Sequence, residues 1–367
     1  MSASHQGAYN PIRWDVGSPR RLHVTHAICA WGVEQEALAE EKELAEGFRP
    51  EKGRRKIATG EGRLAFFLVT PTVLLLGLIV GYPVVKAVFN SFQKDPGLNA
   101  ATGFFNKGGQ FAGLDNYKTW LLQQCPKPGG GTVKCPPGTL ASEFWNSVGF
   151  TLGVTIVAVS LETVIGMIMA LMMHKAFKGR AVVRAAILIP WAIPTAVSAK
   201  LWQVIYAPSG VADKILGHNI IWSEKWPARI AIVITDTWKT TPFMALLILA
   251  GLQGIPDELY ESAKVDGASA WQRFWRITLP LVKPALAVAL IFRSLDTLRM
   301  YDLPAILTGG ANGTSTLSIL VVKQILSGPN SASALSTITF IFIFGCAFIL
   351  VKALGANIMP RPVPKGK

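Results

Sequence analysis

The chain has 367 residues, half of them apolar and only 16% charged, and its mean hydropathy is +0.37. A soluble domain carries about 25% charged residues; here the charges gather in short stretches between long apolar runs, which is typical of a membrane protein. The net charge of +14 would suggest nucleic acid in a soluble protein, but the lysines and arginines lie beside the apolar runs. We therefore expect no nucleic-acid partner and attribute the charge to orientation in a membrane.

The N-terminal residues 1–62 are polar and irregular, and we expect a loose cytoplasmic tail there. The first long apolar run begins only near Leu64, so we expect no cleavable signal peptide.

Beyond the tail, six stretches are long and apolar enough, or nearly so, to cross the hydrocarbon core as helices. They predict an all-α, polytopic membrane protein with a transmembrane domain over residues 63–356 and a short cytoplasmic tail over 357–367. The six predicted spans are roughly Leu64–Val88, Ser147–Met173, Ala181–Tyr206, Arg229–Leu252, Ala285–Leu303 and Ala334–Leu354.

Basic residues are concentrated before span one, between spans two and three, between spans four and five, and after span six. The alternate short loops hold fewer, namely Lys214 and Lys225 in one and Lys323 in the other. The positive-inside rule then predicts that both termini are cytoplasmic and that residues 90–146 form an external loop, which is long enough to be weakly governed by the rule.

Two cysteines, Cys125 and Cys135, flank a Pro/Gly-rich stretch in that loop. In an oxidising compartment they would close a small loop as a disulfide, and the alternative is two unpaired thiols. Cys29 and Cys346 have no evident partner and no metal-ligand spacing, so we predict no metal site.

The loop between spans four and five, about residues 254–284, predicts two short helices with a break between them. Gly267 supplies a stop after the first helix. The second is expected from about Ser269 to Leu279, with Pro280 ending it. Apolar residues along one side of both helices require a partner or the surface of the bilayer.

This loop resembles the signature of binding-protein-dependent ABC importer permeases, which reads Glu-Ala-Ala, three residues, Gly, nine residues, Ile-x-Leu-Pro. Here Glu261-Ser262-Ala263 is followed by Gly267 and then by Ile277-Thr278-Leu279-Pro280, and the one departure is Ser262. Two softer matches, at 238–244 and 292–299, resemble carbohydrate permeases of the maltose/trehalose type.

The resemblance implies a permease of the type I importer kind in a bacterial inner membrane. Its expected partners are a second permease, two cytoplasmic ATPases, an extracytoplasmic sugar-binding protein or lipoprotein, and membrane lipid. In that family the loop is a coupling helix that inserts into a groove of the ATPase. The implied coupling residues are Glu258, Glu261, Ser262, Ala263, Asp266, Gly267, Ile277, Leu279 and Pro280. An amphipathic loop resting on lipid headgroups is the alternative.

No sequence motif points to chemistry on this chain. The only Gly-Lys pair is Gly366-Lys367 at the end of the sequence, so there is no phosphate-binding loop. HExxH, CxxC and GxSxG patterns are also absent from the sequence. We therefore predict a transport subunit with no catalytic residue and no bound cofactor, and expect ATP and Mg to bind the partner ATPase.

Charged residues inside the spans are costly and are functional candidates. The helical rise of about 1.5 Å per residue places Glu162 and Arg293 at similar depths, which predicts an ion pair that fixes helix packing. A substrate path is predicted along Lys239, Trp238, Arg293, Asp296, Arg299 and Tyr301, where charged groups and rings would suit a sugar. The alternative is that these residues are structural as well.

The expected cargo is a disaccharide or small oligosaccharide such as trehalose or maltose. The alternatives are glycerol phosphate or another polyol as cargo, and a secondary transporter that works alone.

Overall fold

The computed structural model describes residues 59–98, 105–106, 108–127, 131–217 and 220–355. The chain divides into two compact units between Leu75 and Leu76, and the packing reported below is that of the second unit. The predicted tail over 357–367 lies outside the described residues, as do residues 1–58 of the N-terminal tail.

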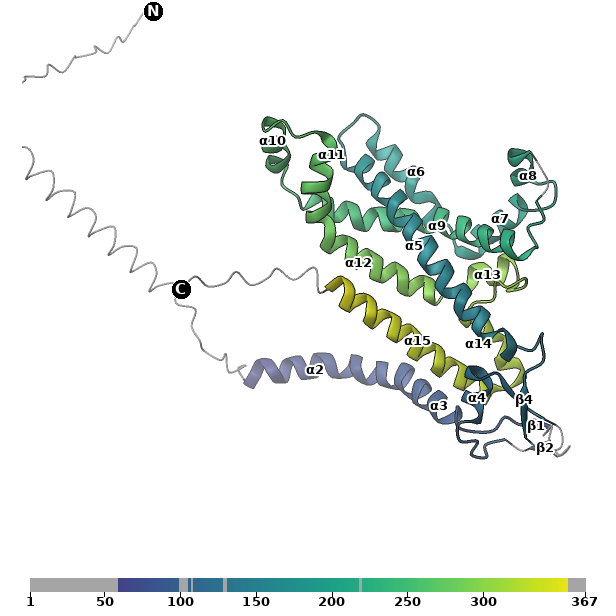
Figure 1. The fold of residues 1–367 in the computed structure, drawn as a ribbon. Coiled ribbons are helices and arrows are strands. Elements are labelled where there is room, and N and C mark those ends of the chain that lie inside the picture. Colours follow the sequence, from purple (N-terminus) through teal and green to yellow (C-terminus); the bar gives the residue numbers. More distant parts are fainter. Residues whose placement is uncertain (1–58, 99–104, 107, 128–130, 218–219, 356–367) are drawn as a thin grey trace, which may run out of the picture. The chain divides into compact units, whose positions relative to one another are not determined.

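The described chain is almost entirely helical (Figure 1). In order, its elements are α2 (Thr59–Leu76), the π-helix η1 (Gly77–Gly81), α3 (Tyr82–Asn90), β1 (Gly97–Leu98), β2 (Phe105–Asn106), α4 (Asp115–Leu121), β3 (Gln124–Pro126), β4 (Thr132–Lys134), the 3₁₀-helix η2 (Ala141–Glu143), α5 (Phe144–His174), α6 (Arg180–Ala192), α7 (Thr195–Ile205), α8 (Val211–Leu216), α9 (Lys225–Gln253), α10 (Asp257–Val265), α11 (Ala270–Arg273), the π-helix η3 (Phe274–Thr278), α12 (Leu279–Leu298), α13 (Asp302–Leu307), α14 (Leu317–Ser327) and α15 (Pro329–Gly355).

Five helices of the described part are long and apolar enough to cross a membrane, and the pair α6 and α7 makes a sixth if it is counted as one span. The all-α membrane fold predicted from the sequence is confirmed. The five are Leu64–Asn90, Ala141–His174, Lys225–Gln253, Ala270–Leu298 and Pro329–Leu354.

The third predicted span is not one continuous helix. α6 and α7 are bent by 91° at a short break, where Ile193 is extended (φ −72°, ψ 133°). Proline disfavours helical geometry in the residue before it and has no N–H to donate, so Pro194 ends α6. The fifth predicted span also ends earlier than expected, at Leu298 instead of Leu303, and a turn leads into α13.

The core of the second unit is built where α5, α9 and α12 lie side by side (Figure 1). Two glycines allow this close packing. A Cβ at Gly166 would lie 3.1 Å from Met244 Cγ, and one at Gly251 would collide with the Cβ of Ala285. An apolar cluster fills the end of this bundle next to residues 254–269, and its buried members include Met167, Ala170, Met244, Ile248, Leu252, Ile255 and Val282.

At the opposite end of the bundle, the described residues between 91 and 143, which we call the 91–143 segment, fold together and pack on α15. β1 and β2 pair antiparallel, as do β3 and β4, and a disulfide joins Cys125 to Cys135 across the second pair. The Asp95 carboxylate accepts hydrogen bonds from the backbone N–H groups of Asn330 (2.6 Å) and Ser331 (3.1 Å). It therefore satisfies free donors at the start of α15 and interacts favourably with the helix dipole.

Candidate translocation cavity and coupling loop

Arg293 on α12 is the centre of a buried group of charges. Its Nε donates to Glu162 Oε2 at 2.6 Å and its Nη2 to Glu162 Oε1 at 2.9 Å, so the two side chains form a two-pronged pair between α12 and α5. Nη2 also donates to Asp236 on α9, and Nη1 donates to Asp296 Oδ2 at 2.8 Å. One guanidinium therefore ties the three core helices together.

We call Glu162, Asp236, Lys239, Arg293 and Asp296 the charge cluster. It holds three carboxylates and two cations, and burial of such groups is tolerated only when each is paired and hydrogen-bonded. Glu162 meets that condition, since it also accepts a hydrogen bond from Thr240 Oγ1 at 2.7 Å. Asp296 differs from the others because its side chain is 70% exposed while that of Arg293 is 1% exposed.

A polar cavity of about 490 Å³ opens on the exposed side of the charge cluster. Four of the six residues predicted to form a substrate path line it, and Arg293 lies behind its wall. The lining residues are Trp191, Thr195, Asp236, Lys239, Thr240, Asp296, Arg299, Met300, Tyr301, Asp302 and Leu303.

Trp191, Thr195 and Asp302 also line this cavity, although the sequence does not predict them there. Trp191 and Thr195 face it only because span three breaks between them, and Asp302 because the chain turns after Leu298. Trp238, in contrast, does not line it. Trp238 lines a separate, mostly apolar cavity of about 670 Å³ between α5, α6 and α9. Its ring also packs edge-on against that of Trp202.

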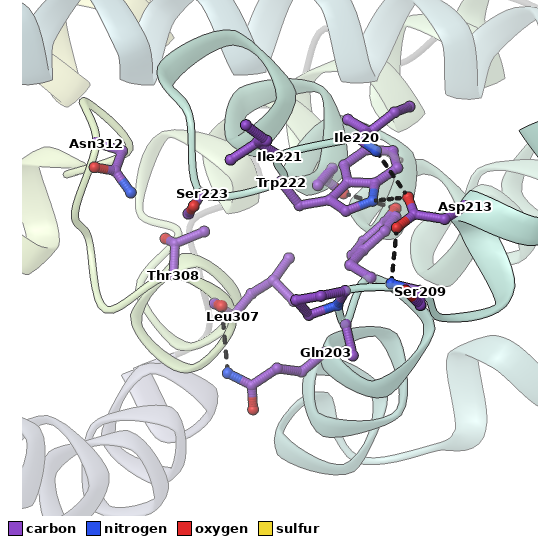
Figure 2. Close-up of a pocket in the computed structure, with 14 residues that line it drawn as sticks. Gln203, Ser209, Asp213, Ile220, Ile221, Trp222, Ser223, Leu307, Thr308 and Asn312 are labelled. Carbon is purple, nitrogen blue, oxygen red and sulfur yellow. Dashed lines mark hydrogen bonds between the residues drawn. The ribbon is translucent and has the colours of Figure 1, made fainter. Parts of the chain in front are cut away.

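A third cavity, of about 650 Å³, lies between the end of α7, the loop that contains α8, and α13 (Figure 2). Asp213 organises its loop wall, since the carboxylate accepts from the backbone N–H groups of Ser209 and Ile220 at 3.0 and 3.1 Å and from Trp222 Nε1 at 3.1 Å. On the other side of the opening, Gln203 Nε2 donates to the carbonyl of Leu307 at 3.4 Å. The aromatic rings of Tyr206 and Trp222, 4.5 Å apart, give this cavity an apolar floor.

The loop with the importer signature forms a compact helical hairpin, and Gly267 makes its turn. The Gly267 φ is +76°, a conformation that residues with a Cβ rarely adopt. Its N–H donates to Lys264 O at 3.0 Å and the next N–H, of Ala268, donates to Ala263 O at 2.9 Å. These two bonds close α10 in a Schellman motif, and Ser269 begins α11 with a capping box to Gln272.

The predicted coupling residues divide into an exposed and a packed group. Glu258, Glu261, Ser262, Asp266, Gly267 and Pro280 are exposed, whereas Ala263, Ile277 and Leu279 are half-buried. The carboxylate side of α10 therefore faces outward and is free of intramolecular ion pairs in the described part of the chain.

One polar contact joins α10 to η3, and apolar residues on either side of the hairpin pack on the core. The hydroxyls of Tyr260 and Thr278 lie 3.0 Å apart, Ile255 is buried in the apolar cluster, and Phe274 and Leu279 pack against it. The prediction that Pro280 ends the second helix was wrong, because the chain continues through η3 into α12. Pro280 is the second residue of α12 and directly follows the π-helical turn η3. α11, η3 and α12 therefore form one continuous helix, which begins after the Gly267 turn.

The chain is similar to known membrane transport proteins. A family model described as "Binding-protein-dependent transport system inner membrane component" matches residues 162–362. The trehalose transport system permease protein SugA of Mycobacterium tuberculosis is 37% identical over 313 residues, which cover 84% of this chain and 93% of that protein. The trehalose/maltose transport system permease protein MalF of Thermococcus litoralis is 38% identical over 306 residues, covering 81% and 95%.

A solved structure has the same fold. It is a crystal structure of a bacterial ABC transporter involved in the import of the acidic polysaccharide alginate, and one of its chains aligns with a TM-score of 0.63 and 23% identity over 81% of this chain and 95% of that one. By its family match and by its extensive identity to these permeases, the chain belongs to the family of binding-protein-dependent transport-system inner-membrane components.

Proposed function

We propose that this protein is a membrane-spanning permease subunit of an ATP-driven importer for a disaccharide or small oligosaccharide of the trehalose or maltose kind. The observation that carries the proposal is the identity, over more than four fifths of the chain, to two permeases named for trehalose and for trehalose and maltose. The exposed carboxylates of α10 and its tight glycine turn support a docking role for the loop.

In this proposal both termini are cytoplasmic, and the chain works with a second permease, two ATPases that bind ATP and Mg, and an extracytoplasmic sugar-binding protein. The hydrolytic step belongs to the ATPases. Glu261 meets a basic group of the ATPase, and the half-buried Ala263 permits close approach. Movement of the ATPase pair passes from α10 to η3 through the contact of Tyr260 with Thr278, and from η3 to α12, which continues the same helix.

The polar cavity is the proposed substrate path through this subunit. Sugars bind through hydrogen bonds to charged or polar groups and through contact of an apolar sugar face with a ring, and Trp191 and Tyr301 supply rings beside Lys239, Asp296 and Arg299. A phosphate cargo such as glycerol phosphate is disfavoured. Three carboxylates, those of Asp236, Asp296 and Asp302, line the cavity against two cations, and like charges repel an anion at short range.

The test is uptake of radiolabelled trehalose and maltose by cells that express the full transporter, with membrane abundance measured in parallel. Glu261→Ala removes the proposed ionic contact, and Gly267→Pro imposes a negative φ on a residue held at +76°. Asp115→Ala is the matched control, since it removes an exposed carboxylate whose ion pair is local, with Lys118.

We expect both loop variants to lose most uptake while present at wild-type abundance, and the control to transport normally. Unchanged uptake in both loop variants would contradict the coupling role. Uptake of glycerol phosphate but of neither sugar would contradict the proposed cargo.

A further inference from the structure

The 91° break between α6 and α7 leaves a backbone carbonyl that the helices themselves do not bind. The N–H of Ile193 still donates to Ile189 O at 3.3 Å, so α6 extends to this residue. Its own carbonyl comes after the last turn of α6 and before Pro194, which offers no donor. A carbonyl at the C-terminal end of a helix carries partial negative charge and favours a cation.

Lys239 on α9 supplies that cation. Its Nζ donates to Ile193 O at 2.7 Å, and the side chain is buried, with 8% of the residue exposed. The three carboxylates of the charge cluster all bind Arg293. Across the residues that the structure describes, the hydrogen bond of Lys239 goes to the break in span three and not to a carboxylate. A desolvated ammonium is costly without a hydrogen-bond partner. The packing of the core helices places Lys239 where the Ile193 carbonyl can be that partner.

The same break forms part of the wall of the polar cavity. Trp191 comes just before it and Thr195 just after it, and both line the cavity together with Lys239 and Asp296. The ring of Trp191 is stacked on Phe243 of α9, with centroids 5.9 Å apart and an interplanar angle of 16°. A change in the bend would therefore move Trp191 and Thr195 relative to the groups on α9 and α12.

We propose that Lys239 is a positioning residue that holds span three in its bent form by binding the carbonyl of Ile193, and so sets the shape of the cavity wall. The bend sets the direction of α7 relative to α6. Lys239 belongs to the charge cluster and binds the break, so it links the bend to the cluster. Its consequence for transport rests on the proposed function. A cargo hydroxyl that took the Lys239 hydrogen bond would release Ile193 and loosen the bend.

The bend can be measured directly by electron–electron double resonance on the complete transporter in lipid nanodiscs. Spin labels are placed at Val182→Cys on α6 and Val204→Cys on α7, both highly exposed, in a background with Cys29→Ser and Cys346→Ser. Each label is 10 or 11 residues from the break, about 15 Å along its helix. From that geometry, opening the bend by about 20° lengthens the label separation by about 3 Å.

We expect Lys239→Met to lengthen the separation by about 3 Å or more and to broaden its distribution, whereas Lys239→Arg, which keeps a cationic donor, retains the wild-type distance. Lys200→Met is the matched control. Lys200 lies on α7, exposed, and donates to Gln203 one turn away, so its loss should not change the distance.

A wild-type label separation in Lys239→Met would overturn the proposal. If, in addition, that variant needed a higher cargo concentration for half-maximal uptake, Lys239 would be a direct cargo ligand instead. Should Lys239→Met fail to assemble, Lys239→Gln is measured in its place, with the same two outcomes, because Gln is shorter and uncharged. The distance is read without cargo, so a failure of the sugar proposal would leave this test intact.

Discussion

Replacing Arg293 with methionine tests whether the charge cluster stabilises the core. Methionine fills the volume of the aliphatic stem without its charge. The change leaves Glu162 and Asp236, whose side chains are 0% and 7% exposed, without their cation. Removing one partner of a buried ion pair costs about 3–5 kcal/mol. The mostly exposed Asp296 adds little, since exposed pairs contribute about 0–1 kcal/mol.

The assay is the melting temperature of the purified transporter in detergent, followed by the loss of its monodisperse elution peak after heating. At about 2–4 °C per kcal/mol for a domain of roughly this size, a loss of about 4 kcal/mol lowers the midpoint by about 8–16 °C. Arg299→Met is the matched control. Arg299 is on the same helix, but it is exposed and makes no ion pair in the described chain.

The destabilisation should be largely reversed in the triple variant Glu162→Gln, Asp236→Asn, Arg293→Met. Its amides still accept hydrogen bonds but carry no buried charge, and neutral replacement of a buried charge group is often tolerated. A melting midpoint of Arg293→Met equal to that of the wild type would refute the reasoning. So would a triple variant less stable than the single one.

Three further predictions concern packing and the 91–143 segment. Gly251→Val should lower membrane abundance, because its side chain would collide with Ala285 at a cost of about 1–3 kcal/mol; Gly345→Val, with nothing within 4 Å of its added Cβ, should be neutral on the same immunoblot. Cys125→Ser should speed proteolytic cleavage within the β3–β4 pair several-fold, since a disulfide that closes a short loop stabilises by about 3 kcal/mol, and equal cleavage rates would refute this. Asp95→Ala should destabilise the start of α15 by about 1 kcal/mol, measured as faster amide hydrogen exchange at 330–333, with no change at α9.

Four of the six predicted spans lie within single long helices of the described chain, because length and hydropathy carry most of the signal for a transmembrane helix. The sequence also placed Glu162 and Arg293 at similar depths, since helical rise converts residue number into height, and the structure brings these two side chains together. Rotation about each helix axis is set by packing and was not predictable. That is why the ion pair between Asp236 and Arg293 was not expected. It is also why Trp238 was predicted in the substrate path although it lines another cavity.

The broken span shows a different limit of sequence reasoning. Pro190 and Pro242 lie inside helices, whereas Pro194 begins a new one. Pro190 and Pro194 both follow an isoleucine in an apolar stretch, so composition does not distinguish a kink from a break. What differs is a partner for the freed carbonyl, and at Ile193 that partner is Lys239, 46 residues away in the sequence. Contacts of that separation leave no local pattern.

The attachment of the 91–143 segment to α15 also has a consequence for biosynthesis. The disulfide spans ten residues, and the two strands beside it are local, so they can form without the rest of the chain. The contacts of Asp95 and Trp120 with residues 330 and 331 instead join positions more than 200 residues apart. They can form only after the ribosome has delivered the last span. The segment therefore completes its packing as a late step. In any chain whose final helix fails to insert, the segment lacks its partner on α15 and is accessible to quality-control proteases.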